Sequence, residues 1–132
     1  MNEPHALKRV LFVGLEPEVV DYSDPALPPG FDAAKIHAGI SIGMQQMAAR
    51  GWHAELCLVR PETATTVLER HLTTDSYGCV VIGGGVRIPP KNLLLFEALV
   101  NTVHKHAPNT SIAFNTVPQD TADAAARWFK GE

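Results

Sequence analysis

The feature that most constrains this chain is a regular alternation of short apolar runs with longer segments of helical periodicity. Four runs rich in Val, Ile and Leu are each followed by a segment whose apolar residues recur every three or four positions. Such alternation predicts a parallel sheet with helices on both faces and right-handed crossovers. The expected strands are residues 8–15, 53–59, 80–82 and 111–116, and the expected helices are residues 33–50, 63–74, 90–107 and a last helix capped by Asp120.

The predicted fold class is α/β: a three-layer αβα sandwich with about four parallel strands. We expect the flavodoxin-like strand order 2-1-3-4, and a Rossmann-like order 3-2-1-4 is the alternative. The 132 residues contain no linker, repeat or low-complexity segment, so residues 1–132 are expected to form one domain.

Charge and hydropathy exclude several classes of protein. The net charge of −3 argues against general nucleic-acid binding, which relies on clustered Lys and Arg. No apolar run approaches the roughly 20 residues of a membrane-spanning helix, and no signal peptide is evident, so a cytoplasmic protein without membrane association is expected. Cys57 and Cys79 lie inside apolar strands and are interpreted as reduced, buried side chains.

The stretch from Tyr77 to Asn92 is the predicted ligand-binding region. A buried strand ends in Gly83, Gly84 and Gly85, and two prolines then begin a helix. In an α/β sheet this places a backbone without side chains at the carboxyl edge, where ligands bind. Arg87 and Lys91 follow the glycines closely, which favours a small anionic ligand. The glycines match neither the dinucleotide nor the Walker fingerprint, so no cofactor is specified, and they could equally serve only a tight turn.

Polar residues from three strand ends are expected to converge beside this turn. Glu16 follows the first strand, Arg87 the third, and Asn115 with Thr116 ends the fourth. Together they could orient a carboxylate or phosphate and exchange a proton with it, which makes Glu16 and Asn115 candidate catalytic residues. The alternative is an ordinary surface ion pair between Glu16 and Arg87. His37, near the start of the first helix, is a weaker catalytic candidate. The remaining histidines are scattered, so no metal site is predicted.

Residues 16–31 form an unusually long connection after the first strand, compared with the usual 2–6 residues. A lid or partner surface and a packed surface loop are equally compatible with this length. Asp32 is the expected cap of the following helix, and Phe31 is expected to pack on Ile36. Gly39 and Gly43, one turn apart in that helix, predict a close backbone neighbour, either the sheet or a partner helix; the third alternative is that they have no special role.

The run from Asp75 to Ile82 that leads into the glycine turn resembles flavodoxin-like domains, including receiver domains of two-component signalling. The resemblance covers most of the chain and implies their topology. It does not carry over their function, because the glycines stand where receiver domains have a phosphorylated Asp, and Glu16 is the only acid where they have a pair.

Two classes of function follow from these patterns. The first is a small-molecule site for an anionic metabolite, with or without catalysis, around Gly83–Gly85. The second is a non-catalytic interaction module that forms a homodimer through the first helix or the third helix, whose apolar sector is wider than one sheet face requires.

Overall fold

The computed structural model describes residues 8–129 and contains one sheet of four parallel strands. The strands are β1 (Arg9–Leu15), β2 (His53–Val59), β3 (Cys79–Ile82) and β4 (Ser111–Phe114). Their order is β2-β1-β3-β4, which confirms the predicted order 2-1-3-4 and rules out 3-2-1-4. Val10 pairs in register with Ala54 on one side and with Cys79 on the other, so β1 and β3 form the centre of the sheet.

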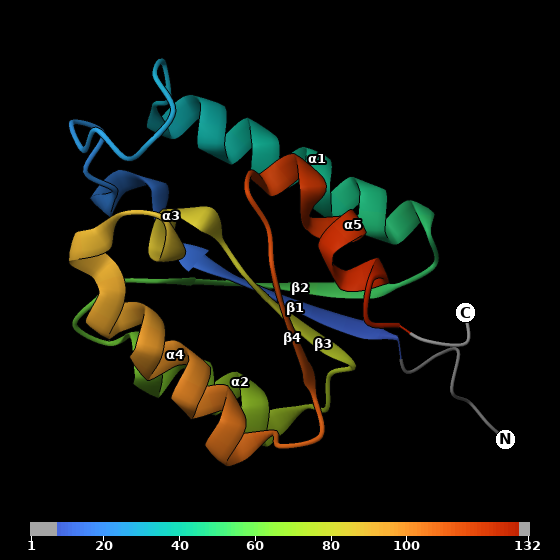
Figure 1. Ribbon diagram of the computed structural model, residues 1–132. Coiled ribbons are helices and arrows are strands. Elements are labelled where there is room, and N and C mark those ends of the chain that lie inside the picture. Colours follow the sequence, from blue (N-terminus) through green and yellow to red (C-terminus); the bar gives the residue numbers. More distant parts are fainter. Residues whose placement is uncertain (1–7, 130–132) are drawn as a thin grey trace, which may run out of the picture.

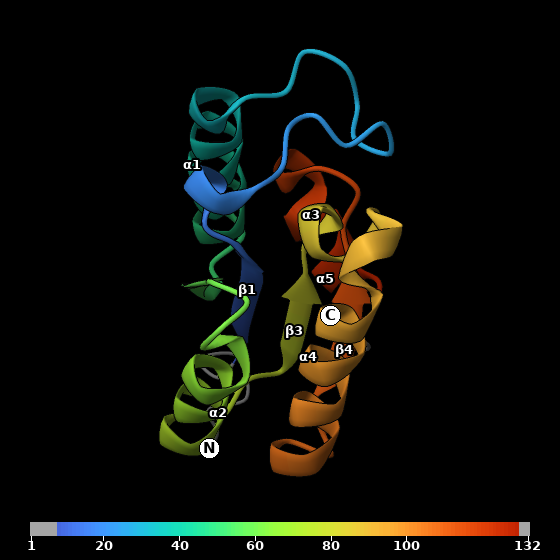
Figure 2. The same cartoon turned by 90° about the vertical axis from the view of Figure 1, so that its left-hand side faces the viewer.

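Helices cover both faces of the sheet (Figure 1). α1 (Ala33–Ala49) and α5 (Thr121–Ala126) lie on one face, and α2 (Ala64–Thr74) and α4 (Leu93–His106) lie on the other (Figures 1 and 2). The alternation of side chains along β1 divides the core accordingly: Leu11 and Val13 pack towards α2 and α4, and Val10 packs towards α1 and α5. The predicted three-layer sandwich is therefore confirmed.

The shorter elements lie in the connections. η1 (Pro17–Val19) follows β1, η2 (Pro90–Asn92) precedes α4, and η3 (Pro118–Asp120) precedes α5. Within the glycine turn, Gly84–Arg87 forms a single helical turn, α3, with Gly83 at its N-cap. No helix among residues 8–129 is both long and apolar enough to cross a bilayer.

Both ends of α1 follow their local sequence signals. The Asp32 carboxylate accepts a hydrogen bond of 2.8 Å from the Lys35 amide, as an N-cap should. Gly51 has φ of +83° just after the helix and provides the left-handed residue that commonly ends one.

The neighbour of the two α1 glycines is different from both expectations. A Cβ added to Gly43 would lie 2.5 Å from the Pro118 carbonyl oxygen, and one added to Gly39 would lie 2.9 Å from the Gln119 side chain. Neither the sheet nor a partner helix is the close neighbour; η3 of the same chain occupies that place. Helical spacing predicted a close contact, but only the tertiary fold brings residues 118–119 onto this face.

Candidate functional site

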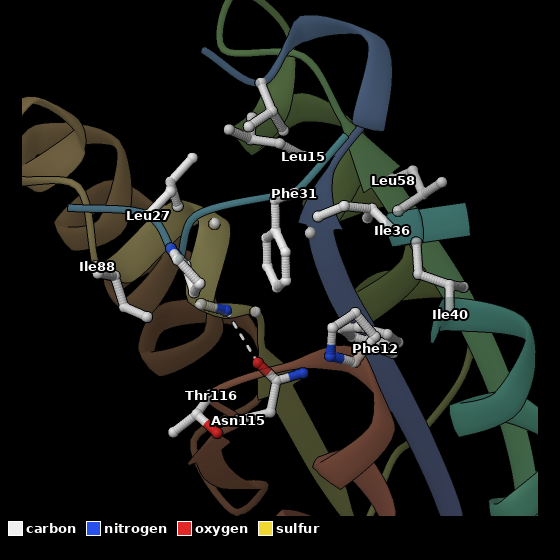
Figure 3. A pocket seen from close by; sticks show the side chains of 17 residues that line it. Phe12, Leu15, Leu27, Phe31, Ile36, Ile40, Leu58, Ile88, Asn115 and Thr116 are labelled. Atoms are coloured by element: carbon white, nitrogen blue, oxygen red, sulfur yellow. Dashed lines mark hydrogen bonds between the residues drawn. The ribbon is translucent and has the colours of Figure 1, made fainter. Parts of the chain in front are cut away.

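An apolar cavity lies at the carboxyl edge of the sheet, on the α1 face. Its volume is about 50 Å³. Two positions without side chains help to create it, because Gly14 near the end of β1 and Gly83 just after β3 both border the hollow. The wall also includes Phe12, Leu58, Ile36 and Ile40 and other residues drawn as sticks in Figure 3.

Residues 16–31, which we call the strap, cover the cavity. The strap arches over the carboxyl end of the sheet before it enters α1 (Figure 2). Leu27 and Phe31 face the cavity, and the Phe31 ring reaches between Ile36 of α1 and the glycine turn (Figure 3). The structure shows this long connection packed on the protein, directly over the predicted ligand edge, and its role as a lid or partner surface stays a prediction.

Acidic residues of the strap pair with basic residues of three different elements. Glu18 lies 2.7 Å from His37 of α1, and Glu16 lies 3.0 Å from Arg60, which follows β2. Asp21 pairs with Lys91 of η2, and the hydrogen bond from this ammonium group is the main cause that lowers the pKa of Asp21 to about 2. All three pairs are substantially exposed to solvent, so each stabilises the closed strap only weakly.

The glycine turn has two kinds of environment. A Cβ on Gly84 would lie 2.8 Å from the Thr116 carbonyl oxygen, so this glycine permits a close approach of the protein's own backbone. A Cβ on Gly85 would meet no atom within 4 Å. Gly84 therefore permits tight packing and Gly85 borders open space, and the ligand-binding role of the turn stays a prediction.

Asn115 forms the polar floor of the cavity. Its Oδ1 accepts a hydrogen bond of 2.9 Å from the Gly84 amide, drawn as a dashed line in Figure 3, and its Nδ2 donates one of 2.9 Å to the Thr121 hydroxyl. The side chain is buried, with 2% exposed. Asn115 therefore joins the end of β4 to α3 and α5, as well as bordering the cavity.

The predicted ligand-binding residues divide into two groups. Gly83, Gly84, Gly85 and Thr116 border the cavity, as does the candidate Asn115, whereas Arg87 and Lys91 do not. The Arg87 guanidinium donates a hydrogen bond of 3.0 Å to the Asn115 carbonyl oxygen and lies over the Phe114 ring. Lys91 is paired with the strap and borders a neighbouring surface hollow.

The candidate catalytic residues do not meet at one point. Glu16 pairs with Arg60, so the ordinary ion pair expected between Glu16 and Arg87 is not formed. His37 is half-exposed and pairs with Glu18 of the strap. Among residues 8–129 no cluster of three His, Cys, Asp or Glu side chains could hold a metal ion.

Sequence reasoning missed the apolar wall of the cavity. Phe12, Gly14 and Leu58 lie within strands that we interpreted only as core, and Leu27 and Phe31 lie in a loop without periodicity. One signal was present, namely a glycine at position 14 within an otherwise continuous apolar strand, where it leaves a gap.

Comparisons with known proteins add no functional information. No family model matches the chain, and the searches of curated proteins and of solved structures gave no significant match.

Proposed function

We propose that this chain is a small-molecule-binding domain whose site is the cavity between the glycine turn and the strap. The observation that carries the proposal is a hollow at the carboxyl edge of a parallel sheet, the usual place for ligands in this architecture. Two of the residues that border it, Gly14 and Gly85, have room for a side chain and lack one.

The proposal concerns binding without catalysis and without a charged anchor inside the cavity. The expected anionic ligand rested on Arg87 and Lys91, and both have protein partners outside the cavity. The catalytic candidates Glu16 and His37 face Arg60 and Glu18 instead of a common centre.

A thermal-shift screen tests the proposal. A mixed library of neutral and charged metabolites is screened, and at least one compound should raise the melting temperature. At a concentration of 100 times Kd, binding stabilises the folded state by about 2.7 kcal/mol, or roughly 10 °C for a domain of this size. If no compound in the library raises the melting temperature, the proposal is contradicted.

Homodimer formation is a second candidate function, and one observation favours α4 as its surface. Leu93 and Leu94 at the start of this helix are 55% and 79% exposed. The two glycines no longer support α1 as the dimer surface, because η3 of the same chain covers Gly39 and Gly43. Sedimentation should show a dimer that Leu94→Glu dissociates, and a wild-type monomer at high concentration would exclude this candidate.

We also propose a cytoplasmic location. The support is that Cys57 and Cys79 are both buried free thiols. Fractionation of cells that produce the protein, with a cytoplasmic marker enzyme as the reference, provides the test.

A further inference from the structure

The lining of the cavity contains no charged group. None of its 17 residues is an Asp, Glu, Lys, Arg or His in the described part of the chain, and Asn115 and Thr116 provide its polar side chains. An ion enclosed there would lose its hydration without gaining a counterion, which is strongly unfavourable. Binding of a charged ligand group in this cavity is therefore unfavourable.

Asn115 can satisfy one uncharged polar group. Its hydrogen bonds to Gly84 and Thr121 use one lone pair of the amide oxygen and one N–H, which leaves one of each without a partner in the described structure. Thr116 is exposed at the edge of the cavity, and its hydroxyl donates a hydrogen bond to Asp120. A hydroxyl, carbonyl or amide group would suit this floor.

The closed cavity is too small for a metabolite. Its volume of about 50 Å³ compares with the roughly 150 Å³ of a cavity that binds benzene. The strap is the covering segment that is best able to move, because the side chains that pair its acids with the body of the domain are largely exposed. Displacing Leu27 and Phe31 would enlarge the same apolar hollow.

We infer that the site takes an uncharged, mainly apolar small molecule with one hydrogen-bonding group, and that the strap lifts to admit it. The apolar body would replace Phe31 and Leu27 against Phe12 and Ile40, and the polar group would face Asn115. This inference rests on the proposed function and specifies the class of its ligand.

Nuclear magnetic resonance titrations with matched probes test the inference. Benzyl alcohol and cyclohexanol are the neutral probes, and benzoate and benzylammonium are charged probes of similar size. The neutral probes should shift the amide signals of Gly83–Gly85 saturably, with affinities at least about tenfold higher than those of the charged probes. Equal or tighter binding of a charged probe at these signals would overturn the ligand class while leaving the proposed function in place. If no probe shifts these signals, even in Phe31→Ala, which removes the ring that covers the cavity, the proposed site itself is refuted.

Filling the cavity provides the matched control. A Cβ on Gly14 would lie 3.8 Å from the Leu58 side chain, an ordinary contact, so Gly14→Val should fold and remove most of the free space. The variant should lose at least about tenfold in affinity for benzyl alcohol while keeping its circular dichroism spectrum. Gly85→Leu is the second variant if the first does not fold. Unchanged affinity in a folded variant would place the binding elsewhere and overturn the inference.

Discussion

The two glycines of α1 have neighbours of different rigidity, and this predicts opposite effects of the same substitution. At Gly43 the neighbour of an added methyl group is the Pro118 carbonyl oxygen, 2.5 Å away, which belongs to the backbone of η3. At Gly39 the nearest atoms, at 2.9–3.1 Å, belong to the amide at the end of the Gln119 side chain, which is exposed and able to turn into solvent. Alanine substitution at the two sites therefore compares a rigid obstacle with a flexible one.

The magnitudes follow from two opposing terms. Replacing glycine by alanine within a helix gains about 1 kcal/mol in helix propensity. Gly43→Ala must in addition move the helix or η3 by about 1 Å to restore an ordinary contact, and overpacking of this kind costs about 1–3 kcal/mol. We expect Gly43→Ala to lower the free energy of unfolding by up to about 2 kcal/mol, because backbone must move. Gly39→Ala should raise it by up to about 1 kcal/mol.

Urea denaturation followed by circular dichroism measures both variants against the wild type. The predicted gap between them is about 2 kcal/mol, with similar dependence on urea concentration because the fold is unchanged. Sedimentation should show the same oligomeric state for all three proteins, since the close neighbour belongs to the same chain. If Gly43→Ala is as stable as Gly39→Ala, the packing of η3 on α1 is not as described and the reasoning is refuted.

Three further predictions concern the floor of the site, pH dependence and the thiols. Asn115→Leu should lower the free energy of unfolding by about 1–3 kcal/mol, because it leaves a buried amide without its acceptor; a loss below about 0.5 kcal/mol in urea titration would contradict this. The hydrogen bond from Tyr77, 2.5 Å long, is the main cause that lowers the pKa of Glu55, so its stabilisation is complete above the ordinary carboxyl pKa and is lost as pH falls through the lowered value. Tyr77→Phe should therefore cost about 1–2 kcal/mol near neutral pH, and this difference from the wild type should shrink below about pH 4; a difference that does not depend on pH would disprove the linkage. Burial raises the pKa of both Cys57 and Cys79 to about 12, so neither should react with a thiol reagent at pH 8 until urea unfolds the protein; rapid labelling of the native protein would count against their burial.

The features that could be predicted from the sequence depend on interactions between residues close together in the chain. Apolar patterns placed the strands and helices to within a few residues. A buried helix face requires an apolar side chain every three or four residues, and a buried strand requires a short continuous apolar run. The caps at Asp32 and Gly51 were predictable for the same reason, since each depends on atoms within one helical turn. The doubly wound topology followed from the alternation of strands and helices, whereas the choice between the orders 2-1-3-4 and 3-2-1-4 needed the structure.

What only the tertiary structure decided depends on atoms far apart in the chain. The positions of Glu16, Arg87 and Asn115 at strand ends were foreseeable, but their partners were not, because a side chain selects among all charges that folding brings within reach. The neighbour of Gly43 and the apolar wall under the strap are likewise products of long-range packing. A spacing of residues indicates that a close contact exists, and only the complete fold determines which atoms make it.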